Sequence, residues 1–173
     1  MAEEIVVPPE VKREIAISSL WSIIMGSLAS TSAGFFGISY GVDWDEYVEK
    51  AGQISKIMGE AGVKQTLEGF KLSGDDCITA AKIHQIMVDA MGFEPKIIEM
   101  TPERAVVHET KCPMLDAAKA VFPKFLEIPV DKMSCTVFDK ACGTTVNPNI
   151  TFRKGETICT GGTVCEHIWE LKK

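Results

Sequence analysis

Cysteines crowd the C-terminal part of this chain. The chain has 173 residues and six cysteines. Four of the six fall within residues 135–173, a fifth forms a Cys-Pro step upstream, and a histidine follows the last one: Cys135, Cys142, Cys159, Cys165, Cys112 and His167. Thiolates are soft metal ligands and strong nucleophiles, although a free thiol also packs readily as a small hydrophobe. The pattern therefore predicts metal chemistry or thiol chemistry, with inert packed thiols as the simpler alternative.

Three of the thiols come from three different predicted elements. Pro113 starts a short helix, which places Cys112 at its N-cap, where the helix dipole favours a thiolate. Cys135 lies on the next helix, and Cys165 lies on the last strand. Three protein ligands with an open fourth position are typical of catalytic zinc. We therefore predict that Cys112, Cys135 and Cys165 bind zinc or another thiophilic divalent metal, although their spacing matches no compact zinc ribbon.

The closing hairpin supplies the predicted proton-transfer residues. If Gly161-Gly162 forms a two-residue turn, Glu156 pairs with His167. Alternation then places His167 and Cys165 on the more apolar, inward face, with Glu156 beside them and Cys159 on the outer face. His167 and Glu156 are the predicted catalytic residues. Direct attack by a Cys112 thiolate is an alternative.

The elements that position these residues change in character along the chain. Helices are expected over residues 9–25, 43–62 and 73–92, with capping-box spacings at Asp43 and Ser73 and a C-terminal Gly92. The third helix carries His84 on an apolar stripe, either as a core histidine or in a pocket. Strands follow at 96–100 and 104–111, a helix at 131–143, and strands at 150–159 and 164–171. Cys77 and Cys142 are assigned to packing.

Helices followed by an antiparallel sheet indicate an α+β fold. We predict one domain over residues 1–173, with a helical N-terminal region (1–70) packed on a mainly antiparallel sheet. Length does not require a second domain.

Composition excludes several classes of partner. The chain is 46% hydrophobic and 24% charged with a net charge of −6, and its basic residues form no run. This balance argues against disorder and against nucleic-acid binding. The acidic N-terminus lacks a secretory signal, which predicts a cytoplasmic protein with reduced thiols. Residues 18–40 are too polar for a membrane span. Their small residues and apolar surface predict a homodimer, and a buried intramolecular helix is the alternative.

The cysteine region resembles a known family. The matching stretches are Gly74-Asp75-Asp76, Glu109-Thr110-Lys111-Cys112-Pro113, Cys135, Asn147-Pro148 and the run from Gly161 to Trp169. Over residues 70–171 they resemble the L-2-amino-thiazoline-4-carboxylic acid hydrolase-like family. The resemblance implies opening of an amino-thiazoline ring to N-carbamoyl-cysteine.

A second resemblance involves a different set of ligands. Glu156-x2-Cys159 with Cys165 is similar to the 4-vinyl reductase-type small-molecule-binding domain. That similarity implies a Glu and cysteines that hold zinc beneath an apolar pocket. It includes Cys159, which the predicted hairpin register places outside.

Two functions are consistent with these patterns. The first is a metal-dependent hydrolase of a small cyclic C–N or C–S compound, in which zinc activates water and His167 or Glu156 moves the proton. The alternative is a zinc-containing small-molecule-binding or sensor domain without catalysis. Its ligand would lie between the helices and the sheet, against aromatic side chains such as Phe138 and Trp169.

Overall fold

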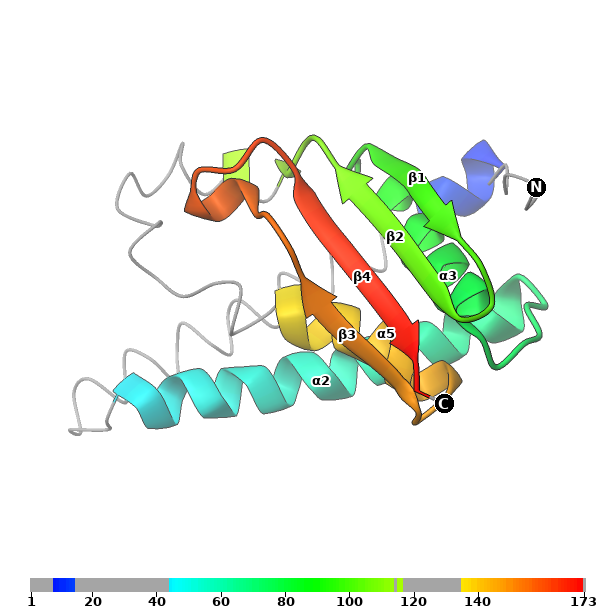
Figure 1. The fold of residues 1–173 in the computed structure, drawn as a ribbon, viewed down its shortest axis with the longest axis horizontal. Coiled ribbons are helices and arrows are strands. Elements are labelled where there is room, and N and C mark those ends of the chain that lie inside the picture. Colours follow the sequence, from blue (N-terminus) through cyan, green and yellow to red (C-terminus); the bar gives the residue numbers. More distant parts are fainter. Residues whose placement is uncertain (1–7, 15–43, 114, 117–134, 173) are drawn as a thin grey trace.

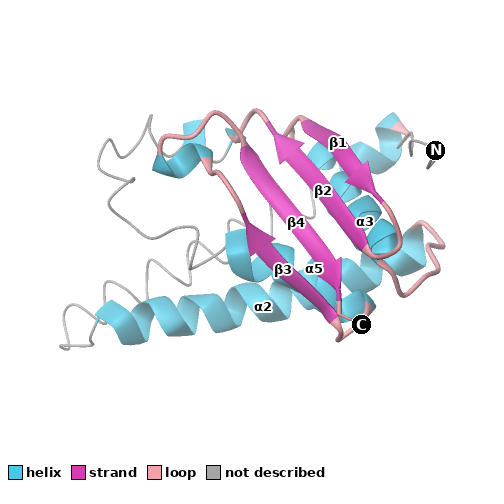
Figure 2. Cartoon of the chain, in the orientation of Figure 1, coloured by secondary structure: helices cyan, strands magenta, loops and turns pink. Residues whose placement is uncertain are grey.

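The fold combines three long helices with a four-stranded sheet (Figures 1 and 2). A computed structural model describes residues 8–14, 44–113, 115–116 and 135–172. The elements in chain order are α2 (Trp44–Gly69), α3 (Cys77–Ala90), β1 (Pro95–Met100), β2 (Arg104–Glu109), α5 (Thr136–Val146), β3 (Ile150–Lys154), the 3-10 helix η3 (Ile158–Thr160) and β4 (Cys165–Leu171). Residues 9–14 are also helical, as predicted.

The sheet is antiparallel throughout, with the strand order β1-β2-β4-β3. Helices α3 and α5 lie behind the sheet in Figure 1, and α2 packs against α5. This arrangement confirms the predicted α+β class, with helices on one face of an antiparallel sheet.

Alternation along the strands divides the sheet into a core face and an outer face. The core face carries Ala105, Val107, Ile150 and Trp169, each at most 1% exposed. Trp169 donates its indole N–H to the backbone oxygen of Asp139 on α5 at 2.9 Å. A buried indole needs such a partner, so this bond fixes α5 against the sheet.

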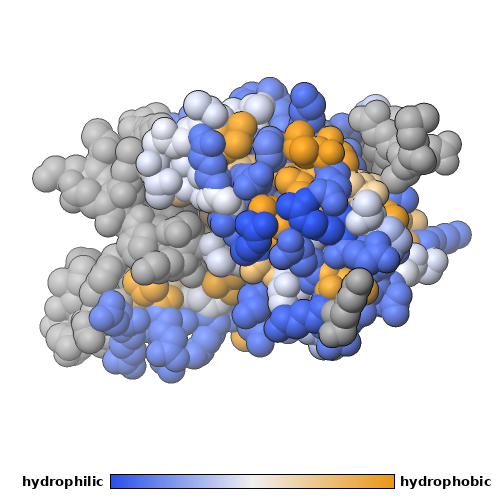
Figure 3. Space-filling model, viewed as in Figure 1, coloured by the Kyte–Doolittle hydropathy of each residue, from blue (hydrophilic) through white to orange (hydrophobic). Residues whose placement is uncertain are grey.

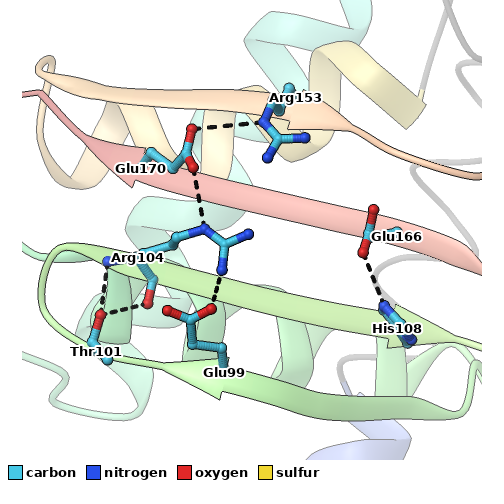
Figure 4. Close-up of polar contacts among 7 residues, drawn as sticks. All are labelled: Glu99, Thr101, Arg104, His108, Arg153, Glu166 and Glu170. Atoms are coloured by element: carbon cyan, nitrogen blue, oxygen red, sulfur yellow. Dashed lines mark hydrogen bonds and ion pairs between the residues drawn. The ribbon is translucent and has the colours of Figure 1, made fainter.

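The outer face is covered by charged side chains. Arg104 reaches Glu99 and Glu170 on the neighbouring strands, and Arg153 lies 3.6 Å from Glu170 (Figure 4). Farther along, His108 Nε2 lies 3.2 Å from Glu166 Oε1. Hydrophilic side chains dominate the middle of this face in Figure 3. Their aliphatic stems cover buried apolar residues between them, since long charged side chains pack in this way.

Two helices run past the glycines that were expected to end them. Helix α2 continues beyond Gly62 to Gly69, and α5 continues beyond Gly143 to Val146. A Cβ at Gly62 would lie 2.8 Å from Met87, and one at Gly143 would lie 2.7 Å from Ile150 and 2.8 Å from Trp169. These glycines permit close packing inside the helix and do not cap it.

The third helix begins later than the capping box at Ser73 predicted. Asp76 is the N-cap, and its carboxylate accepts a hydrogen bond from the Thr79 amide at 2.9 Å. Gly92 does lie just past the C-terminus with φ +83°, as predicted.

The predicted register of the closing hairpin is wrong. Strand β3 ends at Lys154, and η3 lies in the long loop before β4. Lys154, not Glu156, pairs with His167, while Phe152 pairs with Trp169. The loop closes through backbone bonds from Gly161 and Gly162 to residues 157 and 158, so Gly161-Gly162 is not a two-residue turn. Because the register is shifted by two residues, His167 keeps its predicted inward face.

Three sequence predictions lie outside the described residues. They are the helical segment 18–40 with its dimer contact, the capping residue Asp43, and the first four residues of the helix expected over 131–143. Among the helices that the structure describes, none combines the length and apolar character that a bilayer crossing requires.

Candidate functional site

Four buried ionisable side chains meet between the sheet and the helices. His84 comes from α3, Glu109 from β2, Asp139 from α5 and His167 from β4. Each is at most 3% exposed. We call these four residues the histidine–carboxylate ring. Burial of charged groups is costly unless they are paired, so this concentration marks the site most able to support chemistry.

Glu109 lies between the Nε2 atoms of the two histidines. Its Oε1 is 2.9 Å from His84 Nε2, within hydrogen-bond geometry, and its Oε2 is 3.3 Å from His167 Nε2. The sheet positions this carboxylate: Glu109 pairs with Cys165, and the neighbouring Val107 pairs with His167. Glu109 and His167 thus project from the same face of adjacent strands.

Asp139 lies between the Nδ1 atoms of the same two histidines. Its Oδ1 is 3.4 Å from His84 Nδ1, and its Oδ2 is 3.0 Å from His167 Nδ1. These two Nδ1 atoms, His167 Nε2 and Asp139 Oδ2 are all buried without a well-directed hydrogen bond. The histidine nitrogens and carboxylate oxygens therefore lie within contact distance, but they are not aligned for good hydrogen bonds.

The ion pairs in the ring together shift the pKa values of its side chains more than burial does. Burial alone would lower the pKa of His167, but Asp139, Cys165 and Glu109 raise it to about 10. The pKa of His84 is likewise held well above its ordinary value against the effect of burial, by Asp139, Cys142 and Glu109. Burial would raise the pKa of Glu109, yet the two histidines lower it to about 2.

Asp139 responds in the same way as Glu109. Burial would raise its pKa, but His167 and His84 hold it well below its ordinary range. These pKa shifts favour the charged forms of all four side chains, so that opposite charges alternate around the ring.

Lys154 connects the ring to the predicted thiol ligands. Its Nζ lies 3.6 Å from Asp139 Oδ2, and its side chain is 12% exposed. Burial would lower the Lys154 pKa, but Asp139 and the thiols of Cys135, Cys165 and Cys159 raise it. The charge of Lys154 thus interacts with three cysteines from different elements.

The predicted metal ligands have different surroundings. Cys165 lies beside His167, and its sulfur accepts a hydrogen bond from the Ile158 amide at 3.4 Å. Burial raises the pKa of Cys135 to about 12; Lys154 opposes this, while Asp139, Cys112 and Cys159 add to it. Cys112 precedes a helical turn, since its carbonyl oxygen accepts from the Asp116 amide at 3.1 Å. The three predicted ligands therefore lie around the same end of the sheet.

The ligand atoms that lie near enough to share one ion belong to a different set. Within the described ranges, only His84, Glu109 and His167 offer three ligand atoms that all lie within 4.8 Å of one another. The assignment of a metal to Cys112, Cys135 and Cys165 stays a prediction.

The two predicted catalytic residues do not meet. Glu156 is exposed, and its carboxylate accepts hydrogen bonds from the amide and the hydroxyl of Thr163. The hydrogen bond from the backbone N–H of Thr163 is the main reason that the pKa of Glu156 is lowered. His167 is buried and faces Glu109 and Asp139 instead. The structure therefore gives Glu156 a loop-closing contact and no contact with His167.

Cys159 is not on the outer face of a strand. It belongs to η3, where its thiol donates to Thr157 Oγ1 at 3.4 Å. Its thiol also interacts electrostatically with Lys154 and Cys135 and contributes to the raised pKa of each. Both residues lie on the helix side of the sheet. The shifted register removes the reason for separating Cys159 from Cys165.

Sequence reasoning missed both carboxylates of the ring. Glu109 was part of a motif but was given no role, and Asp139 lies within the helix expected over residues 131–143 but was not singled out. Alternation held a signal for Glu109, because it shares a face with Ala105 and Val107. A carboxylate that continues an apolar strand face is an indication of a buried partner. Cys77 and Cys142, assigned to packing, are both 0% exposed.

Comparisons with known proteins bear on the fold. No protein-family model matches the chain, and no curated protein does. Among solved structures, the chain is similar to a trafficking protein particle complex subunit 3 from Naegleria fowleri covalently bound to palmitic acid, with 13% identity, a TM-score of 0.55, and 87% of this chain and 96% of that chain covered. It is also similar to the phenol-responsive sensory domain of the transcription activator PoxR with phenol, with 9% identity, a TM-score of 0.56, and 87% and 74% covered. At these identities the likeness concerns the fold alone.

Proposed function

We propose that this protein is a small-molecule-binding domain of the sensory type, the alternative that the Glu156-x2-Cys159 and Cys165 pattern indicated. The observation that carries the proposal is the fold, which is shared over 87% of the chain with two proteins that hold small molecules. One of these holds palmitic acid and the other holds phenol. Both ligands are largely apolar, which suits a site between helices and a sheet.

The site geometry favours binding over catalysis. A general base needs a nitrogen or oxygen within reach of a substrate proton. Both nitrogens of His167 face carboxylates, and the histidine is 3% exposed. Glu156, its expected partner, is engaged with Thr163 in an exposed loop. The two residues are thus not arranged as an acid–base pair.

Zinc held by thiols is the second part of the proposal. Support comes from Lys154, whose charge interacts with the thiols of Cys135, Cys159 and Cys165. Zinc binds the thiolate form, so metal binding would release the thiol proton of Cys135, whose pKa burial raises to about 12. Cys112 acts on Cys135 and remains a candidate fourth thiol. The zinc would be structural and would brace the loop after β3.

A metal-dependent hydrolase of an amino-thiazoline-like compound is the second candidate. It is favoured by the histidine–carboxylate ring, because buried groups with strongly shifted pKa values are concentrated at catalytic sites. In that case the substrate would have to reach Lys154 and the thiols.

One set of measurements separates the two candidates. The full-length protein is titrated calorimetrically with phenol and with palmitate, and is incubated with 2-amino-thiazoline-4-carboxylate while N-carbamoyl-cysteine is assayed. Saturable binding of either apolar probe without product supports the binding domain. Formation of N-carbamoyl-cysteine that depends on added metal supports the hydrolase. The absence of both binding and turnover would contradict both proposals.

The wider setting also remains a proposal. All six cysteines lie in the described residues and form no disulfide there, which suits a reducing cytoplasm. A homodimer formed through residues 18–40 is retained on the strength of the sequence alone.

A further inference from the structure

The histidine–carboxylate ring has a geometry that its ion pairs do not fully explain. Buried polar atoms in native proteins are nearly always hydrogen-bonded, and exceptions ask for a reason such as an ion. Both nitrogens of His167 are exceptions, as is Nδ1 of His84. Three imidazole nitrogens are therefore buried close to carboxylates without a well-directed bond.

We propose that His84, His167 and Glu109 bind one divalent transition-metal ion through the two Nε2 atoms and the carboxylate, with Asp139 as a positioning residue. This site is distinct from the thiol-held zinc and does not depend on it. Two histidines and one carboxylate are a common donor set for zinc and for non-haem iron.

The distances fit ligands that share an ion. Two donors bound at about 2.0–2.1 Å to one ion lie about 2.9–3.4 Å apart when they are adjacent in octahedral or tetrahedral geometry. Glu109 Oε1 lies 2.9 Å from His84 Nε2, and Glu109 Oε2 lies 3.3 Å from His167 Nε2. All three ligand atoms lie within 4.8 Å of one another.

Asp139 supplies the contact that metal-bound histidines usually make with their second nitrogen. A ligating imidazole normally donates its other N–H to a carboxylate, which fixes the tautomer and the ring orientation. A carboxylate accepts only, so Asp139 at 3.4 and 3.0 Å from the two Nδ1 atoms suits Nδ1 atoms that keep their protons when a metal is bound. The two Nε2 atoms, which lie beside Glu109, would then lose their protons and bind the ion through their lone pairs.

The three histidines of the chain allow a test that needs no mutation. His84, His108 and His167 are the only histidines, and His108 lies on the outer face beside Glu166 (Figure 4). The metal-free, full-length protein is labelled with 15N-histidine, and NMR spectra are recorded before and after addition of more than two equivalents of Zn²⁺, enough to fill both the thiol site and the ring. We expect Nε2 of His84 and His167 to shift to metal-bound values with Nδ1 protonated, and His108 to stay unchanged. Unchanged signals for His84 and His167 would overturn the proposal.

Cobalt distinguishes this site from the thiols. Thiolate ligands give Co²⁺ a near-ultraviolet charge-transfer band that histidine and carboxylate ligands do not. In a Cys135→Ser/Cys159→Ser/Cys165→Ser variant, Co²⁺ should still bind and show only its visible absorption. Loss of all cobalt binding from this variant, with the fold intact by circular dichroism, would contradict a site at the ring.

Variants then assign the roles. These variants are made in the Cys135→Ser/Cys159→Ser/Cys165→Ser background, so that Co²⁺ reports the ring. Asp139→Asn should weaken Co²⁺ binding about 10–100-fold, the usual effect of removing an outer-shell partner. His167→Gln should weaken it further, and the matched control His108→Gln should leave it unchanged. Equal Co²⁺ affinity with and without a folded Asp139→Asn change in that background would overturn the positioning role. If His167→Gln does not fold, the NMR experiment decides on the wild-type chain.

Discussion

His84 on α3 and His167 on β4 lie beside each other with their ring centroids 4.7 Å apart and an interplanar angle of 41°. They are far apart in sequence, and Glu109 and Asp139 each face both of them. Two positive rings at this distance would repel each other without the carboxylates on either side. The pair is therefore stable only as part of the ring, which joins the helix layer to the sheet.

Asp139→Asn should strongly destabilise the protein. Breaking one partner out of a buried ion pair costs about 3–5 kcal/mol, because the remaining charge is left uncompensated. The free energy of unfolding is measured with urea in the presence of EDTA, so that metal does not contribute. Glu170→Gln is the control: it removes a carboxylate from the half-exposed pairs with Arg104 and Arg153 and should cost about 1 kcal/mol or less. Equal losses in both variants would contradict a ring held by charge.

Gly143→Ala should be unfavourable although alanine is the better helix former. The new methyl group would lie 2.7 Å from Ile150 and 2.8 Å from Trp169, so one of them has to move. Overpacking of this kind costs about 1–3 kcal/mol. At Gly69 nothing lies within 4 Å, so Gly69→Ala should be neutral or slightly stabilising. Thermal and urea unfolding of the two variants give the comparison, and a stable Gly143→Ala protein would show that α5 does not approach the sheet this closely.

Cys77 should be among the slowest thiols to react. Burial raises its pKa to about 11, and it is 0% exposed. Thiolate is the reactive form, so both effects suppress modification. With EDTA present, Ellman's reagent should modify half-buried Cys159 in the native protein, and Cys77 and Cys142 only after unfolding. Mass spectrometry of the partly modified protein identifies the sites; early labelling of Cys77 would count against this core.

Light scattering tests the predicted dimer. The chain has a mass of 18.9 kDa, and a homodimer should give twice that value at micromolar concentration. The apolar segment at residues 18–40 is the sequence feature behind this expectation. A monomer at high micromolar concentration would remove the dimer and leave the ligand-binding proposal unaffected.

Local sequence patterns predicted most helices and strands. Where a helix ends differently from the prediction, the reason is packing against residues distant in sequence. The β1–β2 hairpin and the position of Gly92 follow from turn residues close in sequence. Gly62 and Gly143 were both expected to end helices. At Gly143 the neighbouring Ile150 and Trp169 side chains explain why a glycine lies inside the helix, whereas at Gly62 only the flexible end of Met87 lies close. No local rule contains such contacts.

The candidate site shows the same division. His167 and Cys165 were placed on the inward face by alternation, which survives a shift of two residues. Their partner Glu109 is more than 50 residues away in sequence, and Asp139 is on a helix whose rotation depends on Trp169. The sequence alone therefore drew attention to the two histidines of the ring but not to the two carboxylates that they contact.

The last prediction concerns Cys159, whose position depended on the hairpin register. Strand β3 ends at Lys154, and Cys159 lies in η3, where its thiol interacts electrostatically with Lys154 as that of Cys165 does. We therefore expect Cys159 and Cys165 to bind the same metal. Cys159→Ser and Cys165→Ser should each reduce the thiolate-to-cobalt charge-transfer band of the Co²⁺-loaded protein by at least about half. Cys77→Ala, which removes a buried thiol packed in the hydrophobic core, should leave the band intact. A full band in Cys159→Ser with a lost band in Cys165→Ser would restore the set Cys112, Cys135 and Cys165 and favour the hydrolase.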